Sequence, residues 1–190
     1  MKAFRVAALA ALLISCSDAD QLAVPEQAAL TADNLTFFRF SDAAFAAAEK
    51  SGSFWAVAGQ TRTLVLRYTD NGAEFLRFEV GPGSLLRSDS VQITVQVDAS
   101  GQLVFHFAPA GLQFSNSNPA ILRIDYARAN PDIDADGDVD LADRLLTIQA
   151  GIWQRELPLL PWIKIPSINL AETVEQAKVY HFTSFGMAVD

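Results

Sequence analysis

The chain has 190 residues, 51% of them apolar, and its 14 basic and 22 acidic side chains give a formal net charge of −8 at pH 7. This length and apolar content suit one folded domain with a sizeable core and exclude a globally disordered chain. The acidic balance and the lack of clustered basic residues in the sequence argue against nucleic-acid binding.

The amino-terminal segment has the pattern of a secretion signal. Two basic residues lie within the first five positions, and an unbroken apolar run follows over residues 6–14. This run has the length of a signal-peptide core and is too short to span a bilayer. It leads into Leu13-Ile14-Ser15-Cys16, and Cys16 is the only cysteine. The string resembles a bacterial lipobox, which implies removal of residues 1–15 and attachment of lipid to Cys16.

Two other readings of this segment stay open: an ordinary secretory peptide cleaved elsewhere, and a buried structural cysteine. A lone cysteine cannot form an intrachain disulfide, so stability must come from a hydrophobic core. With lipid on Cys16, we expect the protein to be held on a membrane of the bacterial cell envelope. Ser17, directly after the cysteine, points to the outer membrane if the host is Gram-negative.

The next segment, residues 16–33, is polar and rich in alanine and predicts a flexible tether. A domain is expected over residues 34–190, beginning with a strand over 34–40. Ser41 is the predicted N-cap of a short helix over 43–50, with Gly52 as its stop.

Strand signals follow at short spacing, with apolar residues alternating with polar ones. Asp70-Asn71-Gly72 is a hairpin-turn signal within this series. The alternation predicts antiparallel sheets with one face in water, so the expected fold is an all-β antiparallel β-sandwich with one short N-terminal helix and a long Asp-rich loop. The expected strands cover residues 54–58, 62–69, 73–80, 91–97, 103–107, 120–127, 146–156, 162–165, 174–180 and 185–189.

Four segments in order resemble one domain family. They are Val80 to Leu85 (VGPGSL), Val91 to Val95 (VQITV), Phe107 to Tyr126 with its PAGLQF and PAILRIDY strings, and Tyr180 to Val189 (YHFTSFGMAV). Together they resemble the ZU-five domain of zonula occludens proteins, netrin receptors and ankyrins, over about residues 75–190. The resemblance implies a β-sandwich used for interaction or structure, without catalytic residues. Gly83 and Gly111 sit where the chain reverses, and we expect positive φ there.

An Asp-rich insertion over residues 130–144 departs from that family and carries the clearest chemistry. Its alternate carboxylates resemble the twelve-residue calcium loop of EF-hands and dockerins, with Gly137 at the sharp turn and Val139 expected to pin the loop to its domain. The predicted calcium ligands are Asp132, Asp134, Asp136, Asp138 (through its backbone carbonyl), Asp140 and Asp143.

Two departures from the calcium-loop pattern leave an acidic loop without an ion as the alternative. Position twelve is Asp143 rather than glutamate, and the incoming segment predicts a strand rather than a helix. Residues 144–146 could supply a helical turn on the exit side. Six carboxylates in twelve residues repel one another, which favours a bound divalent ion.

The remaining chemistry-bearing residues are sparse. His106 is expected to point opposite to Phe105 and Phe107, towards solvent or the other sheet. His181 is expected to make a structural hydrogen bond. Trp153 and Trp162 flank a Pro- and Leu-rich loop, which predicts either an exposed partner-binding or sugar-binding patch or a cap on the core.

These features predict a non-catalytic, lipid-anchored interaction or structural module that contacts an unidentified envelope protein or glycan. The first alternative is a calcium-dependent protein- or carbohydrate-docking module of dockerin or adhesin type. The second is an envelope hydrolase whose triad is assembled only in space.

Overall fold

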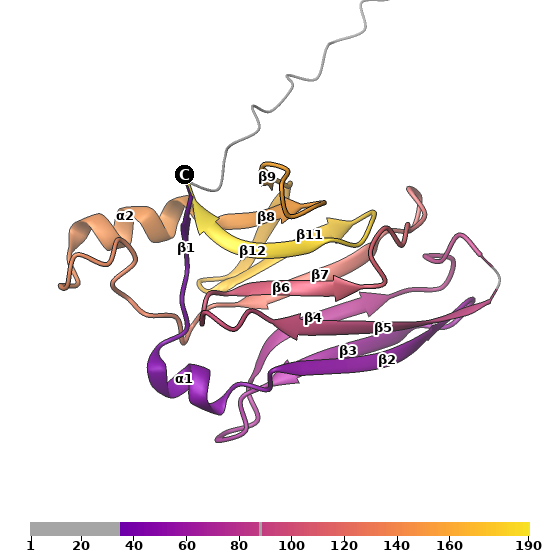
Figure 1. The fold of residues 1–190 in the computed structure, drawn as a ribbon, viewed down its shortest axis with the longest axis horizontal. Coiled ribbons are helices and arrows are strands. Elements are labelled where there is room, and N and C mark those ends of the chain that lie inside the picture. Colours follow the sequence, from indigo (N-terminus) through magenta and orange to yellow (C-terminus); the bar gives the residue numbers. More distant parts are fainter. Residues whose placement is uncertain (1–34, 88) are drawn as a thin grey trace, which may run out of the picture.

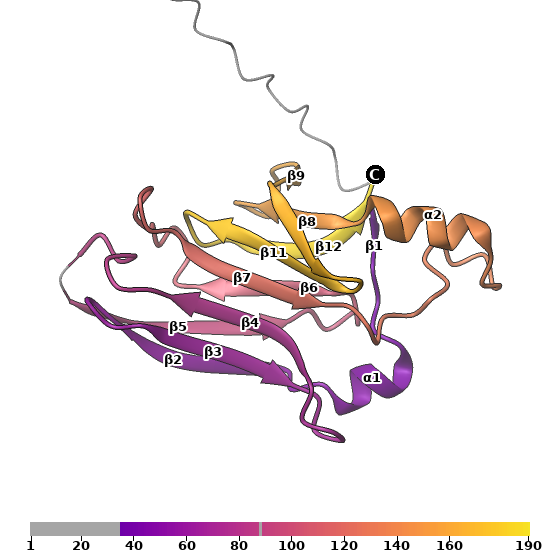
Figure 2. The ribbon, with the colours of Figure 1, turned by 180° about the vertical axis from the view of Figure 1, so that it is seen from behind.

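The computed structural model describes residues 35–87 and 89–190. The predicted signal peptide, the lipid-attachment site Cys16 and the predicted tether lie outside the described residues. The described chain forms two antiparallel sheets stacked face to face, with two short helices at the same end of the stack (Figures 1 and 2). The predicted all-β sandwich is therefore confirmed.

The larger sheet has seven strands and the smaller has five. The larger runs in the order β2 (Ser51–Val57), β5 (Ser90–Val97), β6 (Val104–Ala108), β12 (Ser184–Val189), β8 (Gly151–Arg155) and β9 (Ile163–Lys164), with β1 (Thr36–Phe37) paired to β12. The smaller runs in the order β10 (Ser167–Ala171), β11 (Val174–Val179), β7 (Ala120–Asp125), β4 (Glu74–Val80) and β3 (Arg62–Arg67).

Aromatic rings from both sheets fill the space between the layers. Phe78 of β4 lies 5.0 Å from Phe107 of β6 and 5.2 Å from Phe182, between ring centroids. All three rings are buried. Burial of large apolar surface is the main favourable term in folding, so this aromatic cluster joins the two sheets in the absence of a disulfide.

A second, smaller cluster covers part of the outer face of the larger sheet. Val104 and Ala188 point away from the main core because neighbours in a strand alternate between faces, and they pack with buried Trp153 and Trp162. Phe37 lies over them, with its ring centroid 4.9 Å from that of Trp162. Both tryptophans are therefore buried, but in this outer cluster rather than as a cap on the main core, whereas the leucines of the loop between them are exposed.

Gly186 of β12 leaves the space that this outer cluster needs. A Cβ there would lie 2.9 Å from a ring carbon of Phe37 and 3.1 Å from a methyl of Val104. We expect Gly186→Ala to lower the free energy of unfolding by about 1–3 kcal/mol, because the ring is packed and must shift. Gly151→Ala is the control, since its Cβ would meet only the flexible stem of Lys164. Urea unfolding of both variants measures the difference, and equal stabilities would contradict the prediction.

The first helix begins as predicted, but the residue expected to end it lies elsewhere. In α1 (Asp42–Ala47), the Ala44 N–H donates to the N-cap hydroxyl of Ser41. Gly52 is not the helix stop; it lies inside β2, where a Cβ would come within 2.9 Å of Leu66 on the facing sheet. The glycine thus serves the close approach of β2 to β3.

A second helix, α2 (Leu141–Gln149), replaces the first part of the strand predicted over 146–156. The strand β8 begins only at Gly151. Strand β10 was not predicted, and it lies at the edge of the smaller sheet, where it pairs only with β11.

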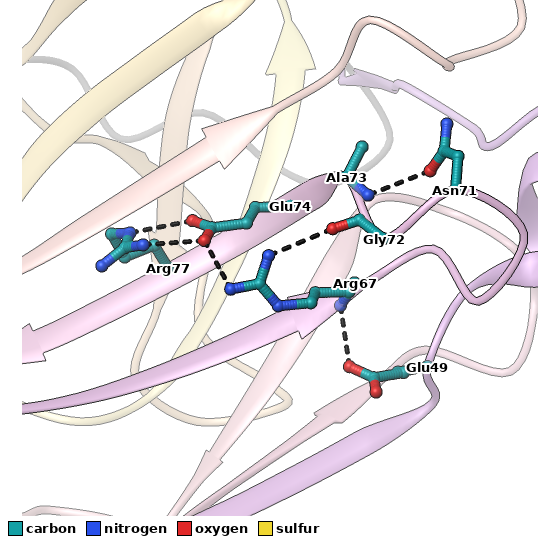
Figure 3. Close-up of polar contacts among 7 residues, drawn as sticks. All are labelled: Glu49, Arg67, Asn71, Gly72, Ala73, Glu74 and Arg77. Carbon is teal, nitrogen blue, oxygen red and sulfur yellow. Dashed lines mark hydrogen bonds and ion pairs between the residues drawn. The ribbon is translucent and has the colours of Figure 1, made fainter.

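The turn between β3 and β4 follows the Asp70-Asn71-Gly72 signal, with Gly72 at φ +72°. Arg67 donates to the Gly72 carbonyl at 3.1 Å and to Glu74 at 2.7 Å, and Glu74 also accepts from Arg77 (Figure 3). Exposed ion pairs contribute little to stability. We interpret this network as a support for the hairpin rather than as a binding site.

Candidate functional site

The Asp-rich loop lies between β7 and α2, at the helical end of the sandwich (Figure 1). Its entry is fixed by the Asn130 N–H, which donates to the carbonyl of Arg39 at 2.7 Å. Ile133 is buried in the main core, whereas Val139 is 59% exposed. The prediction that Val139 pins the loop is therefore wrong; Ile133, at the second position of the loop, has this role.

The first half of the loop brings three carboxylates together. One oxygen from each of Asp132, Asp134 and Asp136 lies within 4.8 Å of the others. Calcium–oxygen distances are about 2.3–2.6 Å, so oxygens on opposite sides of one ion are about 4.8 Å apart. The spacing of this group thus suits three ligands of a single ion.

The backbone turns around Asp132. Gly137 adopts φ +103° and its N–H donates to Asp132 Oδ2 at 3.2 Å. The other oxygen, Oδ1, is buried and has no hydrogen-bond partner among the described residues. An unpartnered buried carboxylate oxygen is costly, and a cation would satisfy it.

Electrostatics within the group are unfavourable without an ion. Partial desolvation raises the pKa of the Asp134 carboxyl above its usual value, although a hydrogen bond from the Asp136 N–H opposes this. The neighbouring charges of Asp136, Asp143 and Asp132 raise it further. The loop therefore holds its negative charges close together at a cost that a divalent cation offsets.

The second half of the loop is organised differently. Asp138, Asp140 and Asp143 form a second group of three, whose oxygens also lie within 4.8 Å of one another. Asp140 is the N-cap of α2 and accepts from the Ala142 N–H at 2.6 Å. The six aspartates thus form two groups of three rather than one, and at Asp138 the side chain, not the predicted backbone carbonyl, belongs to its group.

Asp143 fastens the start of the loop to its end. This buried carboxylate accepts from the N–H groups of Ile133 at 2.6 Å and of Asp140 at 2.9 Å. The Asp140 N–H has the largest effect in holding the pKa of Asp143 below its usual value, with further hydrogen bonds from Ile133 and Asp134. Oδ1 accepts from both Ile133 and Asp134, whereas Oδ2 accepts only from Asp140 and keeps a second lone pair for a ligand.

We expect Asp143→Asn to destabilise the ion-free protein by about 2 kcal/mol, because an amide cannot accept from N–H groups on both sides. Asp138→Asn removes the same charge from an exposed side chain that makes no hydrogen bond to the described residues, and it should change stability by less than about 0.5 kcal/mol. Urea unfolding in excess chelator compares the two. Equal effects would mean that Asp143 acts only through its charge.

A separate polar row crosses the outer face of the larger sheet. His106 Nδ1 lies 2.9 Å from Ser184 Oγ, and Nε2 lies 3.1 Å from Asp98 Oδ2. Ser184 is the cross-strand partner of His106 on one side and of Arg155 on the other. His106 points away from Phe105 and Phe107, as predicted, but its contact with Ser184, 78 residues further along the chain, was not predicted.

A cavity of about 300 Å³ adjoins this row, lined by His106, Asp98 and Arg155 and walled by Phe37 and Trp162. Desolvation acts to raise the pKa of Asp98, but hydrogen bonds from Ser100 and His106 outweigh it and hold the pKa below its usual value. A hydroxyl, an imidazole and a carboxylate in series are the elements of acyl-transfer catalysis.

His181 makes contacts of a structural kind, in line with its predicted role. Its ring lies 3.0 Å from Gln154 Nε2 and 3.5 Å from Glu156. Its backbone also forms an isolated bridge with Gln113.

No family model, curated protein or solved structure matches this chain. Among the described residues, neither helix has the length and apolar character needed to cross a bilayer.

Proposed function

We propose that this protein is a lipid-anchored, non-catalytic interaction or structural module of the bacterial cell envelope, and that its Asp-rich loop binds calcium. The observation that carries the calcium site is the convergence of one oxygen each from Asp132, Asp134 and Asp136, together with the buried, unpartnered Oδ1 of Asp132. Membrane attachment rests on the lipobox at Cys16, and a ZU-five-like ancestry rests on sequence resemblance.

Calcium is the ion that this donor set favours. All the candidate ligands are hard oxygens, which calcium binds in groups of six to eight. Asp132, Asp134 and Asp136 would supply the first trio, with the Asp138 carbonyl, Asp140 and Asp143 on the helical side. A bound ion would supply two positive charges, which offset part of the negative charge of these side chains and would hold α2 against the loop.

The helix that follows the loop supports an interaction role. Leu141, Leu145 and Ile148 fall at helical spacing on one side of α2, and all three are exposed, Ile148 at 80%. Buried Asp143 lies on another side of the same helix. A helix that presents its apolar stripe to solvent is suited to docking, so calcium would set the position of a contact surface.

Calorimetric titration of the full chain with calcium tests the proposal. We expect one ion per chain with a dissociation constant of about 10⁻⁴–10⁻³ M, the range of extracellular calcium modules. Asp132→Asn with Asp136→Asn should remove the binding heat, whereas Glu156→Gln, an acid outside the loop, should leave it unchanged. Undetectable binding at millimolar calcium would refute the site.

An envelope hydrolase is the second candidate, favoured by the Ser184–His106–Asp98 series beside its cavity. Arg155, the cross-strand partner of Ser184, would stabilise an oxyanion in place of backbone donors. Incubation with a fluorophosphonate probe distinguishes the two candidates. Labelling that disappears in both Ser184→Ala and His106→Gln would favour the hydrolase, and the absence of labelling would favour the non-catalytic module.

A further inference from the structure

Exposed apolar side chains gather at one edge of the sandwich. Of the thirteen large apolar side chains that are exposed among the described residues, six lie between Leu157 and Leu170. They are Leu157, Leu159, Leu160, Ile163, Ile168 and Leu170. In a chain with a net charge of −8, the fifteen residues 157–171 contain a single charged side chain, Lys164. We call the six side chains the apolar edge.

The apolar edge lies where the two sheets are left open. Strand β9 ends the larger sheet and β10 ends the smaller, and only Ile165 and Pro166 separate them in the chain. Proteins usually protect edge strands with charges, bulges or a covering segment. Strand β10 has a bulge near Asn169, but its exposed side chains include Ile168 and Leu170.

The turn over residues 157–161, next to this edge, can be transferred from water to an apolar medium at low cost. Leu159, at its tip, is 98% exposed, and the Leu160 N–H is bonded to the Leu157 carbonyl at 3.0 Å. Pro158 and Pro161 have no N–H. Within residues 158–161, Leu159 is therefore the only residue with a backbone N–H that makes no hydrogen bond to another backbone group. The cost of placing the backbone donors of this turn in an apolar medium is small.

Basic and aromatic residues flank the turn in the chain. The Arg155 guanidinium lies 4.6 Å from the ring centroid of Trp162. Lys164 follows two residues later, and its Nζ donates to the Gln149 carbonyl at 3.0 Å. Cations beside a leucine-rich turn suit the phosphates of lipid headgroups while the leucines enter the acyl boundary. The chemistry of the edge therefore matches a bilayer surface.

The described chain begins beside this edge. Leu35 and Phe37 pack against the cluster that contains Trp162, and β9 and the start of the described chain lie on the same side in Figure 1. Eighteen residues separate Cys16 from Leu35, which limits the distance between anchor and domain to about 60 Å. A surface held this close to a bilayer has a millimolar effective concentration, so weak affinity is enough for contact.

We infer that the apolar edge docks on the bilayer to which the chain is attached, with Leu159 inserted below the headgroups. The inference rests on the lipid anchor of the proposed function, and it adds a fixed orientation to it. The sandwich then stands with β9 and β10 on the membrane and with β2, at the far end of the larger sheet, away from it.

Site-directed spin labelling of the lipidated full chain in phosphatidylethanolamine–phosphatidylglycerol vesicles tests this orientation. With Cys16 blocked by lipid, Leu159→Cys provides the only thiol for a nitroxide. Trp55→Cys is the matched control, because Trp55 is also an exposed large apolar residue but lies on β2. We expect oxygen to reach the label at 159 better than a water-soluble nickel chelate, and the reverse at 55.

The outcomes separate the edge from the anchor. If the chain floats with the vesicles but the label at 159 behaves as in water, the docking inference is wrong and the anchor stands. If mass spectrometry finds no acyl groups, the anchor is absent. Docking of the apolar edge is then tested without it, by the same label at 159 in a Cys16→Ser chain at high vesicle concentration. A label at 159 that oxygen reaches better than the nickel chelate then supports docking, and we expect Leu160→Asp to weaken partition into the vesicles about tenfold. A label that behaves as in water overturns the docking inference.

A second copy of the chain is the competing occupant of the edge. Sedimentation of the Cys16→Ser chain without vesicles would then give a dimer that Ile168→Asp converts to a monomer. That result, together with an aqueous label at 159 when vesicles are added, would also overturn the inference.

Discussion

Phe78→Ala should lower the free energy of unfolding by about 3–5 kcal/mol. The ring is fully buried in β4 and lies within 5.0–6.0 Å, between centroids, of Phe107, Phe114 and Phe182. Alanine would lose the transfer free energy of the ring and leave a cavity, because its aromatic neighbours, on β6 and on two segments outside the strands, cannot all close on it. In a domain of this size the loss corresponds to about 10 °C in melting temperature.

Thermal and urea unfolding, followed by circular dichroism, measure the effect of Phe78→Ala. Trp55→Ala is the control, since it removes a larger ring from the exposed face of β2 and should cost much less than Phe78→Ala. A double-mutant cycle of Phe78→Ala with Phe182→Ala should show coupling, because the two cavities overlap. A Phe78→Ala protein as stable as the parent would mean that the core is not where the structure puts it.

Alternation of apolar and polar residues made most of the sandwich predictable. Leu64, Leu66 and Tyr68 were predicted on one face, and all three are buried. Positive φ was also predicted correctly at Gly83 and Gly111. These features depend on local residue order and turn chemistry, which the sequence displays directly.

The strand predicted over residues 146–156 is wrong at its start, where the sequence also carries a local signal for a helix. Asp140 and Asp143 together form the capping box that starts α2, and Leu141, Leu145 and Ile148 have helical spacing. This apolar stripe faces solvent, so the usual link between helical period and burial was absent. The aspartates were interpreted as ligands, although two of them also begin a helix.

Contacts between residues far apart in the chain could not be predicted from the sequence pattern. The hairpin of β5 and β6 brings Asp98 to His106, but Ser184 reaches them only because β6 pairs with β12, and no spacing rule predicts a pairing across 78 residues. The prediction that Val139 rather than Ile133 anchors the loop is wrong for a similar reason. Either apolar residue could have turned inward, and only the path of the loop over the helical end of the core decides between them.

Calcium should raise the melting temperature of the chelator-treated protein by about 5–10 °C. At a free concentration one hundred times the dissociation constant, binding to the native state adds about 2.7 kcal/mol, and each kcal/mol corresponds to about 2–4 °C here. Asp132→Ala with Asp136→Ala should abolish the rise, since it removes the buried unpartnered oxygen and one of the two carboxylates beside it.

The same double variant separates ion binding from a change in the loop itself. In chelator it should be about as stable as the parent, because the removal of two mutually repelling charges offsets the loss of the acceptors for the Gly137 and Asp138 N–H groups. The hydrogen bonds of Asp143 to Ile133 and Asp140 remain. Asp138→Asn should keep the calcium response, since that residue is expected to act through its carbonyl. A melting temperature that calcium leaves unchanged in the parent would remove the metal from the proposed function. A response retained by the double variant would instead move the ion to the trio at the start of α2.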